Sequence, residues 1–340
     1  MVNDMLDVNY IKINTKNLLE NIEILKKNYA YPYYVMDVSN NAFFHGMYLI
    51  KYLEGKIDYL YVNHFKDLLL IRKYNKEIPV IYEGVIHEDN VYDLVMNNAI
   101  LVIHDIKTLE MIRELKIKDV VSFLFYIDPK GYYGISKKQD ITDYLEWDYT
   151  YFKLLGVMAK IEEKDYDEFK YIIRPIAKPE VMLLNFEDDK KKIVGSNAIM
   201  FDYSIYGIEQ NKRKLFKKEE RLLKQVYALY SKVVEVREIT HNKKTKFIAV
   251  ISFGYYHGMN DAIKSVYIQN KLYRIDKITN EFMYVLVDET IKKDMEVEIT
   301  SENNPLENYF SEHTINYFSL FHCNLPIQFE DYILEKTFIY

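Results

Sequence analysis

The stretch ILVIHDIKTLEMIRELKIKDVVSFLFYI, residues 100–127, decides the predicted fold. It begins with one solid apolar run, Ile100–His104, and ends with another, Val120–Ile127. Between the two runs, the apolar residues of Ile106–Leu115 recur every three or four positions, which is the spacing of one face of a helix. Runs this short and this apolar are typical of strands buried on both faces of a parallel sheet. The stretch therefore predicts a strand, a helix and a second, parallel strand.

The same alternation extends outward from this stretch, from about residue 33 to residue 207. Six further short apolar runs occur there, and a second helical pattern lies at Phe65–Tyr74. Eight strands with intervening helices match a closed α/β barrel, and an open doubly wound sheet is the alternative, because periodicity alone does not show closure. The six runs are Tyr33–Val38, Tyr59–Val62, Pro79–Tyr82, Leu154–Met158, Val181–Leu184 and Ile199–Ile205.

The pattern changes after about residue 208. A charged segment, Lys217–Tyr230, has helical spacing, and most of the sequence after it alternates strand-like runs with loop-forming segments. We therefore expect two domains, a barrel with an N-terminal strand over residues 1–210 and a mainly β domain over residues 211–340. The strand-like runs of the second domain are Ser231–Ile239, Lys246–Phe253, Ser265–Ile268, Phe282–Val287 and Met295–Ile299.

Charge and composition exclude several classes of partner. The formal net charge is −6, and the densest basic run, residues 211–218, is typical of a solvated helix face or linker. Nucleic-acid binding requires a concentrated basic face, so we expect none. The single cysteine, Cys323, excludes an internal disulfide and fits a reducing compartment. No apolar run approaches the ~20 residues of a membrane span, and the N-terminal residues are acidic rather than basic. We expect a cytoplasmic protein without a membrane partner.

Five segments, in order along the chain, resemble signature segments of the alanine racemases. Ile11–Ile22 is similar to the opening strand and helix of that family, and Asn40–Gly46 is similar to its Lys-Ala-Asn/Asp-Ala-Tyr-Gly-His-Gly segment. Ile205–Gly207 resembles its Leu-Tyr-Gly, Val250–Gly258 resembles its Gly-Tyr-x-Asp-Gly, and Thr314–Tyr317 has the same letters as its Thr-Ile-Asn-Tyr. The chain is identified as a divergent member over nearly its whole length, which implies an α/β barrel followed by a β domain.

The resemblance implies that the catalytic lysine has been lost. Alanine racemases hold pyridoxal phosphate as a Schiff base on a lysine, and the cofactor ring stabilises the carbanion of the amino acid. That lysine and a tyrosine move the proton on opposite faces of the substrate. The lysine position falls on Ser39, whose hydroxyl cannot form an imine, whereas Tyr255 stands at the position of the tyrosine base. We therefore expect no cofactor and a catalytically inactive chain.

The phosphate site of the family is also degenerate in this sequence. Phe43 replaces a phosphate-binding tyrosine, Asn185–Phe186 replaces an Asn-Ser pair, and Asp202 replaces a glycine that lets the backbone approach the phosphate. Each lost hydrogen bond to a phosphate is worth roughly 1.5–3 kcal/mol, and a carboxylate repels a dianion. The other pocket positions are Met200 and Tyr132 in place of arginines, Lys160 in place of the histidine that stacks on the cofactor, and the retained Tyr317.

Three functional hypotheses follow from these residues. The first is an inactive racemase homologue that acts by binding or regulation through a dimeric scaffold. The second is a divergent amino-acid racemase whose imine lysine has moved to Lys160. The third is a binding module for an amino acid or small anion, in a pocket lined by Ser39, Tyr132, Lys160 and Tyr255.

The family's head-to-tail dimer implies which partners this chain has. In that dimer the β domain of one subunit completes the barrel mouth of the other, so Tyr255 and Tyr317 favour a homodimer, or a heterodimer with an active racemase. A small-molecule ligand is a further expected partner.

No carboxylate or cysteine recurs at ligand spacing near His45 or His257. We expect both histidines to be hydrogen-bonded and no metal to be bound.

Overall fold

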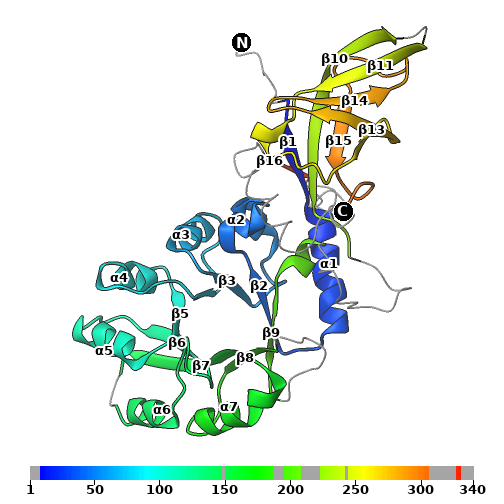
Figure 1. Cartoon of the computed structure of the whole chain (residues 1–340). Coiled ribbons are helices and arrows are strands. Elements are labelled where there is room, and N and C mark those ends of the chain that lie inside the picture. Colours follow the sequence, from blue (N-terminus) through cyan, green and yellow to red (C-terminus); the bar gives the residue numbers. More distant parts are fainter. Residues whose placement is uncertain are drawn as a thin grey trace, which may run out of the picture. The chain divides into compact units, whose positions relative to one another are not determined.

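The computed structural model describes residues 8–147, 150–186, 195–207, 223–241, 244–305 and 327–330. Contacts within the chain define two compact units (Figure 1). One comprises Met1–Leu25, Phe43–Gly46 and Tyr203–Tyr340, and the other comprises Lys26–Ala42 and Met47–Asp202. The predicted domain boundary near residue 210 stays a prediction, because it falls outside the described residues.

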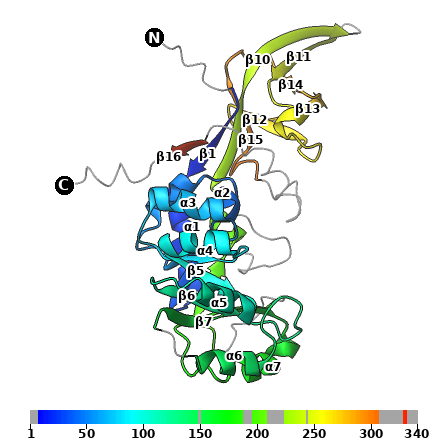
Figure 2. The same cartoon turned by 90° about the vertical axis from the view of Figure 1, so that its left-hand side faces the viewer.

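The second unit is a closed barrel of parallel strands, as the sequence predicts. Its strands pair in chain order from β2 to β9, and β9 pairs with β2 to close the barrel. Figures 1 and 2 show helices α3 to α7 following one another around the outside. The strands are β2 (Tyr33–Asp37), β3 (Tyr59–Val62), β4 (Val80–Tyr82), β5 (Ala99–Ile103), β6 (Val121–Tyr126), β7 (Phe152–Ile161), β8 (Val181–Phe186) and β9 (Ala198–Phe201).

Short helices connect these strands. Among the described residues, no helix has the length and apolar character needed to cross a membrane. Predicted and observed helices coincide at Phe65–Tyr74 and differ by one residue at the end of Ile106–Glu114. The helices and 3₁₀ turns of this part of the chain are α2 (Ser39–Phe43), η1 (Met47–Tyr52), α3 (Phe65–Tyr74), α4 (Glu88–Met96), α5 (Ile106–Glu114), α6 (Lys138–Leu145), η2 (Glu163–Asp165), α7 (Tyr166–Ile173) and η3 (Tyr203–Tyr206).

Apolar side chains fill the barrel interior. Strand β5 is buried along its whole length, as expected for a strand with the barrel interior on one side and helices on the other. The interior is therefore a packed core and not a pore. Its buried residues are Val35, Tyr59, Ile81, Ile100, Val102, Leu124, Leu155, Met158, Val181, Leu183 and Ala198, with Tyr33, Tyr61, Tyr126 and Met200 packed against them.

The first unit is built on a β-sheet that includes the N-terminal strand. Strand β10 pairs with β11 and with β15, and these pairings close a ring of antiparallel strands through β12, β13 and β14. Strand β1 extends the sheet, antiparallel to β10 and parallel to β16. The strands are β1 (Tyr10–Asn14), β10 (Tyr227–His241), β11 (Lys244–Ile251), β12 (Ser265–Ile268), β13 (Lys271–Ile278), β14 (Met283–Val287), β15 (Glu296–Thr300) and β16 (Ile327–Glu330), with a 3₁₀ turn, η4 (Tyr255–His257).

Two expectations from the sequence are wrong in detail. The helix predicted over Lys217–Tyr230 does not occur in its described part, because β10 begins at Tyr227, and Tyr227 and Leu229 pair with residues of β1. The last barrel strand ends at Phe201, so Ile205 lies in the following 3₁₀ turn and not in the strand.

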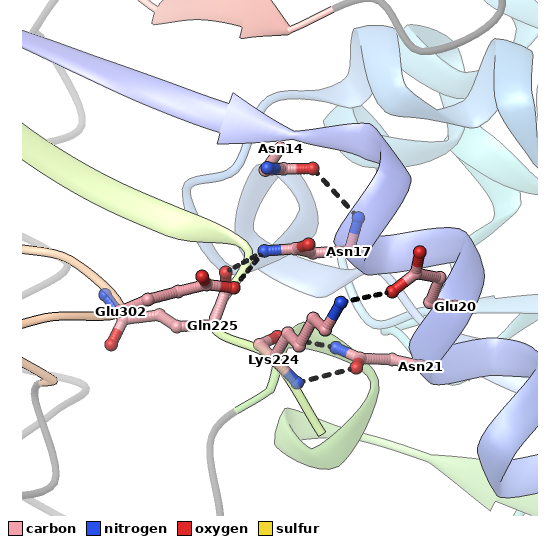
Figure 3. Close-up of polar contacts among 7 residues, drawn as sticks. All are labelled: Asn14, Asn17, Glu20, Asn21, Lys224, Gln225 and Glu302. Carbon is pink, nitrogen blue, oxygen red and sulfur yellow. Dashed lines mark hydrogen bonds and ion pairs between the residues drawn. The ribbon is translucent and has the colours of Figure 1, made fainter. Parts of the chain in front are cut away.

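Helix α1 (Thr15–Asn28) is joined to the start of β10 by asparagine side chains (Figure 3). Asn14 caps the helix, because its side chain accepts the Asn17 amide at 2.9 Å. The buried Asn21 amide group donates to the carbonyls of Ile205 at 3.1 Å and Lys224 at 2.7 Å, and its oxygen accepts the Lys224 amide at 2.8 Å. One side chain therefore satisfies three backbone groups from distant parts of the chain.

Replacing Asn21 by leucine tests this bridge. Leucine has a similar size but leaves the three backbone groups without their partner, so we expect the free energy of unfolding to fall by about 3 kcal/mol in urea denaturation. Glu20→Gln is the control, because it removes only the half-exposed ion pair between Glu20 and Lys224 and such pairs contribute little. Equal effects of the two variants would contradict the structural role of Asn21.

Candidate functional site

Polar side chains stand at the C-terminal ends of the barrel strands, above the apolar interior. Because side chains of a strand alternate between its two faces, a residue two positions beyond an inward-facing apolar residue also faces inward. In α/β barrels this end of the strands carries the functional site. The polar residues that follow an interior residue in this way are Asp37 on β2, Tyr61 on β3, Glu83 after β4, His104 after β5, Tyr126 on β6, Lys160 on β7 and Asp202 after β9.

Carboxylates surround Ser39, the position predicted to replace the imine lysine. Ser39 is 2% exposed, and its amide donates to Asp37 at 2.9 Å. Burial raises the pKa of Asp37 to about 7, and the carboxylates of Asp202 and Asp67 raise it as well, whereas hydrogen bonds from Ser39 lower it. The sequence singled out Asp202 but neither of the other two carboxylates. This end of the barrel is therefore acidic where a phosphate group would need positive charge.

A left-handed turn begins directly after Ser39. Five consecutive residues that are not glycine, Asn40 to Phe44, have positive φ angles between 47° and 66°. Such a conformation costs roughly 1–2 kcal/mol for each residue, less for asparagine. The buried Asp67 compensates by accepting the amides of Asn40 at 2.8 Å and Asn41 at 3.1 Å, and the Asn41 side chain accepts the Met47 amide at 2.8 Å. Backbone strain of this kind is concentrated at functional sites.

The residues that end this turn pack among aromatic rings of the first unit. The Phe43 ring lies 4.6 Å from the Tyr203 ring and 5.5 Å from the Tyr206 ring. The buried His45 stacks on Tyr206 at 4.3 Å, and its Nδ1 lies 3.0 Å from the Phe43 carbonyl oxygen, to which it donates. The expectation of a hydrogen-bonded His45 is confirmed. Phe43 offers a ring to this cluster and no hydroxyl to an anion.

The other predicted pocket residues of the barrel lie on several different elements. Lys160 has an exposed side chain, and its backbone amide bonds the Tyr126 hydroxyl. Tyr132 is 88% exposed in the loop after β6, and Met200 packs on the apolar interior. In β8, Asn185 and Phe186 pair with residues of β7, while their side chains, like all of Tyr317, lie outside the described residues.

Tyr255 and His257 lie in the first unit, in the turn η4. Tyr255 is 40% exposed and its hydroxyl donates to Asp261 at 2.7 Å, which raises the pKa of Tyr255. A tyrosine that acts as a base near neutral pH needs the opposite shift. His257 accepts the Gly254 amide at 3.2 Å, which confirms a hydrogen-bonded histidine. Within the described residues no group of three potential metal ligands occurs.

A second group of polar residues in the barrel mouth was not predicted. In this group, called the Glu83 cluster below, the Tyr61 hydroxyl donates to Glu83 at 2.6 Å and His104 Nε2 lies 3.7 Å from the other Glu83 oxygen. Burial raises the pKa of Glu83 and lowers that of His104. The signal in the sequence was a polar residue in the last two positions of an apolar run, or directly after it. The cluster comprises Tyr61, Glu83, His104, Tyr126 and Tyr133.

Comparisons with known proteins show the fold of alanine racemase over nearly the whole chain. No family model and no curated protein sequence matches this sequence. The structure of alanine racemase from Oenococcus oeni matches with a TM-score of 0.82 at 17% identity, over 95% of this chain and 98% of that one. That from E. faecalis gives 0.81 at 14%, over 97% and 100%, and that of Clostridium difficile 630 gives 0.79 at 17%, over 96% and 97%. This chain therefore combines an α/β barrel with an antiparallel β-barrel domain, as alanine racemases do.

Proposed function

We propose that this chain is a protein with the alanine racemase fold that does not use pyridoxal phosphate and acts by binding. The observation that carries the proposal is the acidic surrounding of Ser39, in which the carboxylates of Asp67 and Asp202 act on Asp37. A cofactor bound here would bring a phosphate dianion towards acidic groups, none of which offers it a positive charge. The loss of catalytic activity is part of this proposal.

The residues of this end of the barrel do not fit the cofactor. A buried serine hydroxyl at residue 39 provides no amine for an imine. Phe43, where the family places a phosphate-binding tyrosine, packs against Tyr203 and Tyr206. The relocated-lysine alternative would use Lys160, but its side chain is exposed, whereas a lysine is activated for imine formation by desolvation or by a neighbouring cation.

Cofactor binding is tested by visible absorption. The purified chain is incubated with excess pyridoxal phosphate and desalted, and we expect no absorption band of a protonated imine, because nothing holds the cofactor. The Lys160→Ala variant is the control, with the same featureless spectrum. A band in the wild type that disappears in Lys160→Ala would overturn the proposal and make the chain an enzyme with a relocated lysine.

The acidic surrounding of Ser39 also predicts how stability depends on pH. Folded Asp37 keeps its proton up to about pH 7, whereas the unfolded chain releases it near 3.8, so the folded state loses stability as the pH rises through this range. Asp37→Asn retains an oxygen for the Ser39 amide and cannot ionise. We expect this variant to match the wild type near pH 4 and to exceed it by about 2–4 kcal/mol at pH 8 in urea unfolding.

The control for the pH series is Asp58→Asn. Asp58 also accepts a backbone amide, that of Tyr34 at 2.8 Å, but it is exposed. The difference between this variant and the wild type is expected to stay constant with pH. A constant difference for Asp37→Asn as well would show that Asp37 ionises normally and would remove the main support for the proposal.

We propose that binding includes a partner chain, in a homodimer or in a heterodimer with an active racemase. Exposed tyrosines in both units support a protein interface, because exposed aromatic residues are enriched in interfaces. Tyr132 is 88% exposed and Tyr133 59% in the barrel, and Tyr256 is 74% exposed in the other unit. The family resemblance implies a head-to-tail dimer in which the β domain of one subunit completes the barrel mouth of the other.

Sedimentation analysis tests the dimer. We expect the chain to sediment as a dimer, and Tyr132→Asp to weaken association by about ten-fold or more. Tyr92→Asp is the matched control, since Tyr92 is 56% exposed on α4, and it should leave association unchanged. A monomer that dimerises only with an added alanine racemase would select the heterodimer, and a chain that stays monomeric in both cases would exclude this partner proposal.

A further inference from the structure

The loop after β6, residues 128–135 and called the Asp128 loop below, is held in one conformation by its own hydrogen bonds. The Asp128 carboxylate accepts the amide of Tyr132 at 2.7 Å and that of Tyr133 at 2.9 Å. The Asp128 amide donates to the Ile135 carbonyl at 3.1 Å, which closes the base of the loop. One acidic side chain therefore fixes the backbone on which the two tyrosines stand.

Neighbouring segments of the barrel hold the same loop. His104 Nδ1 donates to the Tyr133 carbonyl oxygen at 3.1 Å. Lys130 forms ion pairs with Glu162 and, at 3.5 Å, with Asp165. Such exposed pairs contribute little to the stability of a chain. Here they tie the loop to the segment after β7 and restrict its motion.

The Asp128 loop presents Tyr132 to solvent. The side chain is almost fully exposed, although its backbone amide is bonded to Asp128. A tyrosine has only two side-chain torsions to lose when an interface buries it, and a loop that is already ordered loses little more. An exposed tyrosine on a fixed backbone is therefore suited to be an anchor residue of a protein interface.

The first unit carries a groove whose walls are also fixed. The groove has a volume of about 400 Å³ and is lined by Tyr256, Thr279, Asn280 and Glu281. The amides of Tyr255 and Tyr256 donate to the carbonyls of Thr279 at 3.0 Å and Asn280 at 2.8 Å. A Cβ at Gly254 would lie 2.4 Å from the Thr279 carbonyl oxygen, so only glycine lets the turn η4 approach the turn after β13 this closely.

The chemistry of this groove complements a tyrosine side chain. The exposed ring of Tyr256 offers an aromatic contact, and the Asn280 amide group donates to the Tyr256 hydroxyl at 3.2 Å, which holds that ring. Glu281 is exposed and offers a carboxylate oxygen. A tyrosine that becomes buried needs a hydrogen-bond partner for its hydroxyl, and this carboxylate provides one.

We propose that Tyr132 of one copy of this chain inserts into the groove of a second copy. Its ring packs against Tyr256 there, and its hydroxyl donates to Glu281 there. Each chain carries one anchor and one groove, so two copies can make the same contact twice. Asp128 is a positioning residue, because it acts through the loop backbone. This inference rests on the proposed function and names the two surfaces through which the partner chains meet.

Photocrosslinking of the full-length chain tests the contact. Tyr132→p-benzoylphenylalanine keeps an aromatic ring at the anchor, and irradiation is expected to join two copies. Mass spectrometry should place the new bond in peptides that contain residues 254–258 or 279–282. The same substitution at Tyr92, which is exposed on α4, is the control and should give no linked dimer. A bond to Tyr132 that maps elsewhere on the chain would overturn the inference.

A pair of small substitutions tests the hydrogen bond. Tyr132→Phe removes only the donor and Glu281→Ala removes the acceptor, so each is expected to weaken association by about ten-fold in sedimentation analysis. Because both remove the same bond, the double variant should associate about as weakly as either single variant. Glu289→Ala removes an exposed acid from another groove and should leave association unchanged. Effects that multiply in the double variant would contradict the assigned pair.

Asp128→Ala tests the positioning role. It leaves the Tyr132 side chain intact but removes the acceptor of two loop amides, so association should weaken by about ten-fold because the anchor is no longer ordered in advance. Asp58→Ala is the control, since exposed Asp58 also accepts a backbone amide, that of Tyr34 at 2.8 Å. Equal association of the two variants would show that Asp128 does not position the anchor.

The outcome is separable from that of the proposed function. A dimer that forms without the crosslink to the groove contradicts only this contact. A chain that pairs solely with an added alanine racemase contradicts this inference and retains the partner proposal. A chain that stays monomeric in both cases overturns the two together.

Discussion

The alternation of side chains along the strands of a closed barrel is the constraint on which the site depends. Every second residue of each strand faces the interior, and these inward-facing residues form a row along the strand. The next residue of the row after the last apolar one therefore stands at the open end of the barrel. In this chain, Val35 and Ile81 belong to the core, and Asp37 and Glu83 come next in the same rows. The chemistry of the barrel mouth is therefore set by whichever residue follows each apolar run.

The fold was predictable because its signals are local and strong. Strand β3 and helix α3 coincide with the predicted segments, since buried apolar runs and helical spacing are visible over a few residues. The sequence did not predict strand β13, because Lys271–Ile278 is largely exposed and its apolar residues are interspersed with polar ones. The helix predicted to end at Tyr230 was wrong there because pairing with β1, more than two hundred positions earlier, decides the conformation of Tyr227–Tyr230.

The site was predictable only where the family resemblance supplied a position. Ser39 and Asp202 were found in that way, and the structure adds Asp37 and Asp67 as carboxylates that act on the same end of the barrel. The Glu83 cluster has no counterpart in the quoted family segments. Its members come from four different barrel segments, and the parallel pairing of β3, β4 and β5 brings Tyr61, Glu83 and His104 together. Such neighbours cannot be recognised before the pairing of the strands is known.

The position of β1 has a consequence for the order in which the chain folds during synthesis. The strand leaves the ribosome before every strand of the barrel, yet it pairs with β10 and β16, and Asn17 bonds the carbonyl of Gln225. The barrel strands, in contrast, pair mostly with the strand before or after them in the sequence. The barrel can therefore form early from neighbouring segments, whereas β1 must wait for about two hundred residues to be added before β10 exists and for about three hundred before β16 exists. During that interval its apolar residues Ile11 and Ile13, which are fully buried in the finished fold, are available for chaperones or for aggregation.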